Sequence, residues 1–447
     1  MIKDKFSRVG FILAAAGSAV GIGNIWKFPY LTGDNGGGAF VLVYLLTILL
    51  IGISVFIAES FIGYKTNKDS VSAFESLALK NKSSWKFAGF SFLTALTILS
   101  FYVIVTGWIL QYIVISLSNL PSNVQEAEEV FMELLTTDLS SQLIYFIISF
   151  LIIAFTVSRG IKDGIEKLNF ILMPSLIVIM VGMLLYSMSF DSFKDAVYFM
   201  FYPNFDKFSS SSILVAIGQA FFTLSIGMAV ILTYSSSLDE STNIVKSSIF
   251  VAIVDTIIAL MAGLIIFTIL FNAGFESSKG AGLVFITLPA LFYELGAMGN
   301  IIAVAFFISL AFAALTSAVS ILEPGVRYLE ERINIPRKKS SLIISLVLSV
   351  IGFVALLSNL SAYSEALTFG SRNLFDWFDF ISSAILLPLG GIATSLFVGF
   401  FIDQKMLKEH MMQFFNNEKI YNWWLFTIRY IVPISVGLVM VKELGGF

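Results

Sequence analysis

Long apolar runs separated by short polar loops account for most of the chain. A helix that crosses the hydrocarbon core of a bilayer needs about 20 mainly apolar residues. A shorter, glycine-rich segment from Ser277 to Leu295 predicts a loop helix between the seventh and eighth runs. Eleven runs are long enough to span a membrane, at residues 8–32, 39–63, 87–117, 140–157, 163–187, 212–236, 243–271, 298–329, 340–357, 374–401 and 421–443. The pattern therefore predicts an all-α polytopic membrane protein with 11 transmembrane helices.

Two of these spans are interrupted near their middles. Span one has three glycines and an asparagine within the eight residues from Gly17 to Asn24, and each Gly disfavours a regular helix by about 1 kcal/mol relative to Ala. Span six carries the small and polar stretch Thr223 to Gly227. Paired interruptions in corresponding positions of two halves indicate a transporter binding site. Close helix packing through small residues is the alternative, and the polar groups at the same depth make it less favoured.

The two interrupted spans are the first members of two sets of five. This spacing predicts a single transporter domain over residues 1–447 with an internal repeat. The first five-helix repeat covers residues 8–187, the second covers residues 212–401, and residues 421–443 form an additional helix.

Composition and charge exclude several functions. Hydrophobic residues make up 57% of the chain and charged residues only 13%, about half the share in a soluble domain. The net charge of −3 argues against nucleic-acid binding, and the absence of cysteine excludes disulfides and thiolate chemistry. The single histidine, His410, lies in a polar stretch outside the spans. No motif pairs a nucleophile with a base and none resembles a channel filter, so neither an enzyme nor a channel is favoured.

Basic residues gather in alternate loops, which predicts the orientation of the chain. The N-terminal segment and the loops after spans two, four, eight and ten carry most of the Lys and Arg, whereas the loop after span three is acidic from Glu126 to Asp138. The N-terminus is therefore expected in the cytoplasm. An odd number of spans then places the C-terminus outside.

Several acids fall within apolar spans. Glu59, Asp255, Asp376 and Asp379 are expected in the membrane, where a charge costs at least about 2.5–3.5 kcal/mol. Each is therefore a candidate functional residue. The alternatives are a protonated, hydrogen-bonded acid at Asp255 and a structural hydrogen bond from Glu59 to broken backbone.

Hydroxyl groups interrupt the apolar run of span eight at Thr316 and Ser317. They could simply donate to the carbonyl one turn back. Together with Asn24, Asp255 and the carbonyls of broken helices, however, they offer only hard oxygen ligands. Such a set suits an alkali cation better than a transition metal.

Several motifs resemble the neurotransmitter:sodium symporters. Gly17 to Pro29 and Asn35 to Phe40 are similar to the first span of that family, and Gly218 to Gly227 to the sixth. Gly282 to Pro289 resembles its fourth extracellular loop and Ala313 to Ser317 its eighth span. The resemblance covers nearly the whole chain. It implies the leucine-transporter (LeuT-type) fold, a 5+5 inverted repeat, and sodium-coupled import by alternating access. Eleven spans are typical of bacterial members, so a bacterial inner membrane is expected.

The resemblance also implies two sodium sites, a substrate pocket and a gate. The first sodium ion is expected at Ala19, Asn24, Thr223, Asp255 and the carboxylate of the substrate. The second is expected at the carbonyls of Gly17, Val20 and Ala313 and the hydroxyls of Thr316 and Ser317. The pocket is expected to be lined by Ala19, Gly21, Gly23, Ile98, Tyr102, Phe222, Ser225, Met228, Ser317 and Ile321. Tyr102 and Phe222 would close over the substrate, beneath an outer ion pair of Lys27 and Asp379.

The substrate class follows from the residue at position 21. Monoamine carriers of the family place an Asp where this chain has Gly21, so here the substrate must supply its own carboxylate to the adjacent sodium ion. This favours an α-amino acid. The apolar walls at Ile98, Phe222, Met228 and Ile321 favour an apolar or aromatic side chain, although Met adapts to different shapes.

Three departures from the family pattern carry predictions. Asp255 stands where Asn is common, while Ala259, one turn on, stands where chloride-independent relatives carry an acid. Asp255 is therefore expected to supply a fixed negative charge near Tyr44, Gln219 and Thr223, so that chloride is not required. Lys27 stands where Arg is common, and its ammonium group cannot form the bidentate pair with a carboxylate that a guanidinium forms. The usual Arg and Trp of the N-terminal segment are replaced here by Lys3, Lys5 and Phe6. An inner gate is therefore expected to pair Glu331 with Lys3 or Lys5.

The expected partners are an amino acid, two sodium ions and membrane lipid, with no nucleic acid. One chain contains the whole expected site, so a monomer is sufficient for function, and a dimer is compatible with it. The alternative is a non-transporting amino-acid sensor on the same scaffold, which concentrative uptake would distinguish from a carrier.

Overall fold

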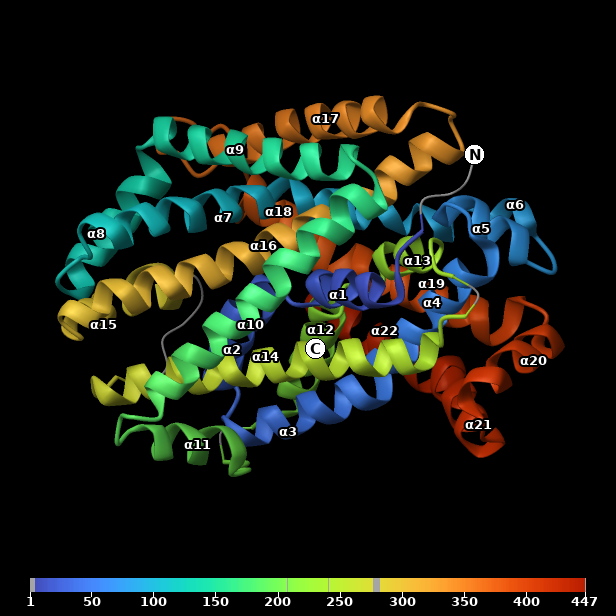
Figure 1. The fold of residues 1–447 in the computed structure, drawn as a ribbon, viewed down its shortest axis with the longest axis horizontal. Coiled ribbons are helices and arrows are strands. Elements are labelled where there is room, and N and C mark those ends of the chain that lie inside the picture. The colour runs from blue at the N-terminus through green and yellow to red at the C-terminus, as the bar shows by residue number, and fades with distance from the viewer. Residues whose placement is uncertain (1–4, 207, 240, 276–281, 447) are drawn as a thin grey trace.

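The computed structural model describes residues 5–206, 208–239, 241–275 and 282–446. The described chain is almost entirely helical, and a short ribbon of β1 (Thr368–Phe369) and β2 (Arg372–Asn373) is its two-stranded sheet. Most long helices run roughly along the long axis of the molecule (Figure 1). The predicted all-α class is confirmed.

Within the described residues, nine helices are long and apolar enough to cross a membrane. The second to fifth predicted spans correspond to Gly38–Thr66 (α3 and α4), Lys82–Ser118 (α6 and α7), Leu139–Ser158 (α9) and Ile161–Ser187 (which includes α10). The later ones correspond to Ile244–Asn272 (α14), Met298–Glu331 (within α16, Ala297–Glu331), Arg337–Leu357 (α17), Leu374–Phe401 (which includes α18 and α19) and Glu418–Glu443 (which includes α21 and α22).

Predicted spans one and six are broken helices. The first consists of α1 (Arg8–Ala19) and a second segment, Gly23–Asp34, bent from it by 48°. The sixth consists of α12 (Ser210–Thr223) and α13 (Val230–Ser235), with six residues between them outside any helix. Neither half of the sixth span is long enough to cross a membrane as a single helix, so this span is not among the nine.

Short helices cover the two ends of the bundle. In Figure 1, α8 (Val124–Thr136), α11 (Phe193–Phe201) and α15 (Leu288–Glu294) lie at one end, and α5 (Ser70–Leu77), α6 (Lys82–Trp85) and α20 (Gln404–Phe415) at the other. The predicted loop helix is present over Leu283–Glu294, and its expected start falls outside the described residues. Acidic α8 and the basic loop that contains α6 thus lie at opposite ends.

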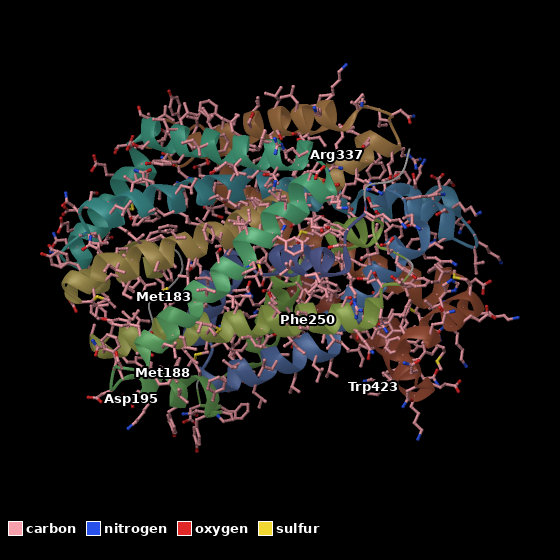
Figure 2. The ribbon with its side chains drawn as sticks, viewed as in Figure 1. Met183, Met188, Asp195, Phe250, Arg337 and Trp423 are labelled. Atoms are coloured by element: carbon pink, nitrogen blue, oxygen red, sulfur yellow. The ribbon has the colours of Figure 1, made fainter. Side chains whose placement is uncertain are left out.

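The outer surface of the bundle is apolar, as lipid requires. On α10 (Lys167–Ser187), Ile171, Val178 and Leu185 lie seven residues apart, so they share one face, and each is 59–70% exposed. Phe250 on α14 and Trp423 on α21 (Glu418–Phe426) lie on the same kind of surface (Figure 2). The polar side chains at the middle depth of the spans instead point inward, toward the two broken helices.

Candidate functional site

The break in span one frees the carbonyl groups at the end of α1. Val20 leaves the helix with φ −71° and ψ 102°, although its N–H still donates to the Ala16 carbonyl at 2.7 Å. The Gly21 N–H donates to Oδ1 of Asn24 at 3.0 Å, just before the helix resumes at Gly23. Because the last four carbonyls of a helix have no partner within it, the oxygens of residues 17–20 are available to other groups.

The break in span six is held open by positive φ angles. Ser225, Gly227 and Ala229 have φ values of 54°, 85° and 59°. At Gly227 a Cβ atom would lie 2.5 Å from the Leu387 carbonyl oxygen, so only glycine fits. The Gly227 N–H donates to Oε1 of Glu59 at 2.7 Å. Glu59 therefore makes the structural hydrogen bond to broken backbone that was considered as its alternative role.

The two breaks lie against each other. The Ser225 hydroxyl donates to the Ser18 carbonyl at 2.8 Å, and Nε2 of Gln219 donates to the Gly23 carbonyl at 2.8 Å. The Ser317 hydroxyl of α16 lies 3.1 Å from the Gly17 carbonyl and 3.2 Å from that of Val20. Segments about 200 and 300 residues apart in sequence thus converge on one short stretch of backbone.

Asp255 forms the first cluster of oxygen atoms. Its Oδ1 accepts from Nδ2 of Asn24 at 2.7 Å and from the Thr223 hydroxyl at 2.9 Å. Its Oδ2 has no partner within the described part of the chain, and the residue is fully buried. A buried carboxylate is unfavourable unless it is paired with a cation, and protonation is the other way to remove the cost. The unpartnered oxygen beside Asn24 and Thr223 therefore fits a small hard cation.

Two further polar atoms near Asp255 lack partners among the described residues. They are the Tyr44 hydroxyl and Oε1 of Gln219, and both are buried. Buried polar atoms are normally hydrogen-bonded, so both atoms are candidates for contact with a polar ligand.

A second cluster lies between α1 and α16. Thr316 donates to the Phe312 carbonyl one turn back at 2.9 Å and lies 3.1 Å from that of Ala313, whereas the Ser317 hydroxyl crosses to α1. The back-bonding considered for both residues therefore occurs at Thr316 alone. The carbonyls of Gly17 and Val20 complete a set made only of oxygen, which suits an alkali cation.

Sequence reasoning missed Asn169, which borders the second cluster. Its Nδ2 donates to the Ile165 carbonyl at 2.9 Å, and its Oδ1 is buried without a described partner. Oδ1 lies so close to Gly17 that a Cβ atom there would overlap it. An amide side chain within the apolar run of span five was the available signal.

A small cavity lies between the breaks. Its volume is about 20 Å³, close to the room that one water molecule needs. All ten residues expected in the substrate pocket line it, together with Ser18 and Thr223. The Tyr102 hydroxyl accepts from the Ile22 N–H at 3.3 Å. At Gly21 a Cβ atom would lie 2.7 Å from the Ser317 hydroxyl and 3.1 Å from that of Tyr102.

Comparisons with known proteins agree with this arrangement. A model of the sodium:neurotransmitter symporter family matches residues 3–129 and 132–446. The chain is 35% identical to YhdH, an uncharacterised sodium-dependent transporter of Bacillus subtilis, over 98% of this chain and 97% of the relative. An uncharacterised sodium-dependent transporter of Haemophilus influenzae is 30% identical over the same shares. The structure of MhsT in complex with L-phenylalanine matches with a TM-score of 0.89 and 36% identity, over 99% of this chain and 100% of MhsT.

The chain belongs to the sodium:neurotransmitter symporter family. The leucine-transporter fold and the resemblance stated from the motifs are thereby confirmed. Membership makes the protein a sodium-dependent, multi-pass membrane transporter. The relatives are transporters, and they give no support to the alternative of a sensor.

A second cavity of about 160 Å³ adjoins the symporter's pocket. Gly23, Tyr102 and Phe222 line both cavities, so these residues separate them. Lys27 and Asp379 line this second cavity, but the structure does not form the predicted ion pair between them. Instead the Lys27 ammonium lies 4.6 Å from the centre of the Phe222 ring, and Asp379 accepts from the Ser383 hydroxyl.

The residues predicted for an inner gate have other partners in the described chain. Lys5 pairs with Asp239 at 3.2 Å, whereas Glu331 pairs with Arg327 at 2.8 Å and accepts from the Asp69 N–H. Lys5 thus pairs with Asp239. The predicted inner gate between Glu331 and Lys3 or Lys5 stays a prediction, because Lys3 lies outside the described residues. Phe6, only 2% exposed, packs its ring against Tyr234 at 5.2 Å.

Proposed function

We propose that this symporter imports a small apolar or aromatic α-amino acid together with two sodium ions. The carrying observation is the contact at Gly21, where even a Cβ atom would lie 2.7 Å from the Ser317 hydroxyl and 3.1 Å from that of Tyr102. The protein therefore provides no carboxylate at this position. The substrate must bring one, which an amino acid does and a decarboxylated amine does not. A similar structure, that of MhsT, is a complex with L-phenylalanine.

Sodium site one is assigned to Asn24, Thr223, Asp255 and the Ala19 carbonyl, completed by the carboxylate of the substrate. The unpartnered Oδ2 of Asp255 supports this assignment. Its charge also replaces chloride, since it lies beside Thr223 in a region with the unsatisfied Tyr44 and Gln219. Transport is thus expected to be independent of chloride.

Sodium site two is assigned to the carbonyls of Gly17, Val20 and Ala313 and the hydroxyls of Thr316 and Ser317. Asn169 adds a sixth oxygen to this set. Its Oδ1 is buried, unpartnered and adjacent to Gly17. An unmade hydrogen bond of this kind costs about 1–3 kcal/mol, which a bound cation would offset.

Transport proceeds by alternating access around the two breaks. Sodium orders the interrupted backbone, the substrate completes the first ion's shell, and Tyr102 and Phe222 close above it. The repeats at residues 8–187 and 212–401 move relative to each other, and residues 421–443 lie outside both. The chain works as a monomer in a bacterial inner membrane, with a cytoplasmic N-terminus. The loop basic residues support that orientation.

Uptake into proteoliposomes tests this proposal. A sodium gradient should drive concentration of apolar or aromatic amino acids from a panel of twenty labelled ones, and chloride replacement by gluconate should leave the rate unchanged. Sodium-dependent binding without accumulation would contradict symport. Accumulation of monoamines instead would contradict the substrate class.

The Gly21→Ala substitution tests the pocket assignment directly. The added methyl group overlaps the Ser317 hydroxyl, and overpacking costs about 1–3 kcal/mol, so the KM for the amino acid should rise about 5–100-fold. Gly182→Ala is the matched control, because a Cβ atom there meets nothing within 4 Å. Equal KM values for the two variants would place the substrate elsewhere.

A further inference from the structure

An apolar groove of about 580 Å³ lies on the outer surface of the bundle, away from both ion clusters. The α6 helix and the start of α7 (Phe92–Ser118) form one wall, with Trp85, Phe87 and Leu93, and α19 (Leu387–Leu396) forms the other, with Leu389 and Ala393. The volume falls in the range of ligand sites, about 300–1,000 Å³. Every lining residue is uncharged.

The groove opens toward lipid rather than toward the transport pathway. Phe87, Leu93 and Leu389 are 66%, 49% and 46% exposed on spans that the bilayer must cover. The helix that carries Leu389 runs on for 12 residues to Phe401, about 18 Å at 1.5 Å per residue. The groove itself follows this span from Leu386 to Ala393, about 10 Å, which fits within the roughly 15 Å of hydrocarbon that one leaflet contributes.

One end of the groove is basic. Lys80 and Lys82 are exposed, and Lys86 is half-buried with its ammonium 5.3 Å from the centre of the Phe87 ring that lines the groove. None of the three forms a salt bridge to another described residue. A set of cations at the mouth of an apolar groove matches an amphiphile with an anionic head.

Trp85 fixes the level of the headgroup. Its ring packs against Phe397 at 4.9 Å and Phe401 at 4.6 Å, close to the end of that span. Tryptophan is enriched at the membrane–water interface. Its indole N–H donates to no group in the described chain, and neither does the Ser84 hydroxyl, so both can donate to a phosphate.

We propose that this groove binds one anionic phospholipid, with an acyl chain between α7 and α19 and the phosphate at Lys82, Lys86 and Trp85. Basic pockets between transmembrane helices bind anionic headgroups in this way. A zwitterionic lipid offers the same chain but no net charge, so the lysines select against it. The site depends only on the membrane setting of the chain and not on the proposed substrate or ions.

The groove adjoins the transport machinery through α19. Gly390 lines the groove, and a Cβ atom on it would overlap the carbonyl of Gly227 in the break of span six. A lipid in the groove therefore presses on a helix that supports this break. Uptake should be faster in vesicles that contain the anionic lipid than in zwitterionic vesicles with the same chains.

Native mass spectrometry of the full chain in detergent tests the site. Phosphatidylglycerol and phosphatidylcholine with identical acyl chains are titrated separately. One phosphatidylglycerol molecule should remain bound to each protein chain at low lipid concentration. In the Lys82→Gln/Lys86→Gln variant its affinity should fall about 30-fold, or about 2 kcal/mol, since each lysine near an anionic surface contributes about 1 kcal/mol. The Lys405→Gln/Lys419→Gln variant removes the same charge elsewhere and should bind normally.

Filling the groove provides a second, independent arm. Ala393→Phe should displace the bound lipid. Leu346→Phe should not, because Leu346 lies on α17, outside the groove, and its side chain is 57% exposed. Equal retention of the two lipids by the unmodified protein would overturn the proposal. So would a phosphatidylglycerol affinity that the lysine and Ala393 variants leave unchanged.

Discussion

At the scale of single residues, the site is marked by buried oxygen atoms that lack partners. Asp255 accepts two hydrogen bonds through Oδ1 and none through Oδ2, and Asn169 leaves Oδ1 unpaired beside Gly17. Unsatisfied atoms of this kind are rare in a protein interior. Two of them, each beside a broken helix, account for where sodium is proposed to bind.

Replacing Asp255 with Asn tests the first of these atoms. The substitution keeps an acceptor for Asn24 and Thr223 but removes the negative charge. Interactions with a charged group contribute about 1.5–3 kcal/mol, so the sodium concentration for half-maximal uptake should rise at least about tenfold. Uptake should also become faster in chloride than in gluconate. Unchanged anion dependence would contradict the role of Asp255 as a fixed charge.

Replacing Asn169 with Leu tests the second atom. The variant removes an unpaired buried oxygen, so it should be at least as stable as the unmodified protein in the absence of sodium. Its stabilisation by added sodium should be weaker, with a half-maximal concentration about tenfold higher. Thermal unfolding at graded sodium concentrations measures both. Ser345→Ala, which removes a buried unpaired hydroxyl on α17, should leave the sodium response unaltered.

At the scale of helices, the breaks matter more than the intact spans. Breaks in spans one and six could be predicted because small and polar residues in an apolar run disfavour a regular helix. Their partners could not, because Ser225 with Ser18 and Gly227 with Glu59 depend on how distant helices pack. The same reason explains why the pairing of Lys5 with Asp239 could not be predicted. Run length predicts a span, but it does not predict what the span touches.

Gly227→Ala tests whether the break in span six must be open. A side chain at φ 85° costs about 1–2 kcal/mol, and the added methyl group would also crowd the Leu387 carbonyl. The variant should unfold at a lower temperature and lose sodium-driven uptake. Gly437→Ala, in α22 (Val432–Glu443), meets nothing within 4 Å and should keep both properties. Normal uptake by Gly227→Ala would show that this backbone geometry is dispensable.

At the scale of the whole molecule, the number of ions sets how steeply substrate accumulates. The membrane potential contributes about 2.3 kcal/mol per charge at 100 mV, and a tenfold sodium gradient adds about 1.4 kcal/mol per ion. Two ions with a zwitterion give about 7 kcal/mol, or roughly 10⁵-fold accumulation, and one ion gives only a few hundred-fold.

Accumulation in tight proteoliposomes therefore counts the sites that function. We expect the unmodified chain to exceed about 10³-fold at 100 mV and a tenfold gradient, which one ion cannot drive. The Thr316→Ala/Ser317→Ala variant should fall to the one-ion limit or below. A ceiling of a few hundred-fold in the unmodified chain would mean that a single ion is coupled.

The hydrogen bond between Ser225 and Ser18 joins residues from opposite halves of the polypeptide. Each proposed ion shell likewise takes oxygen from both halves, as Asn24 and Asp255 show at site one. Neither half of the chain alone contains a complete sodium site. An ancestral protein that consisted of one repeat could have formed such a site only as a dimer of two copies in opposite membrane orientations. Fusion of the two copies would have made this arrangement permanent.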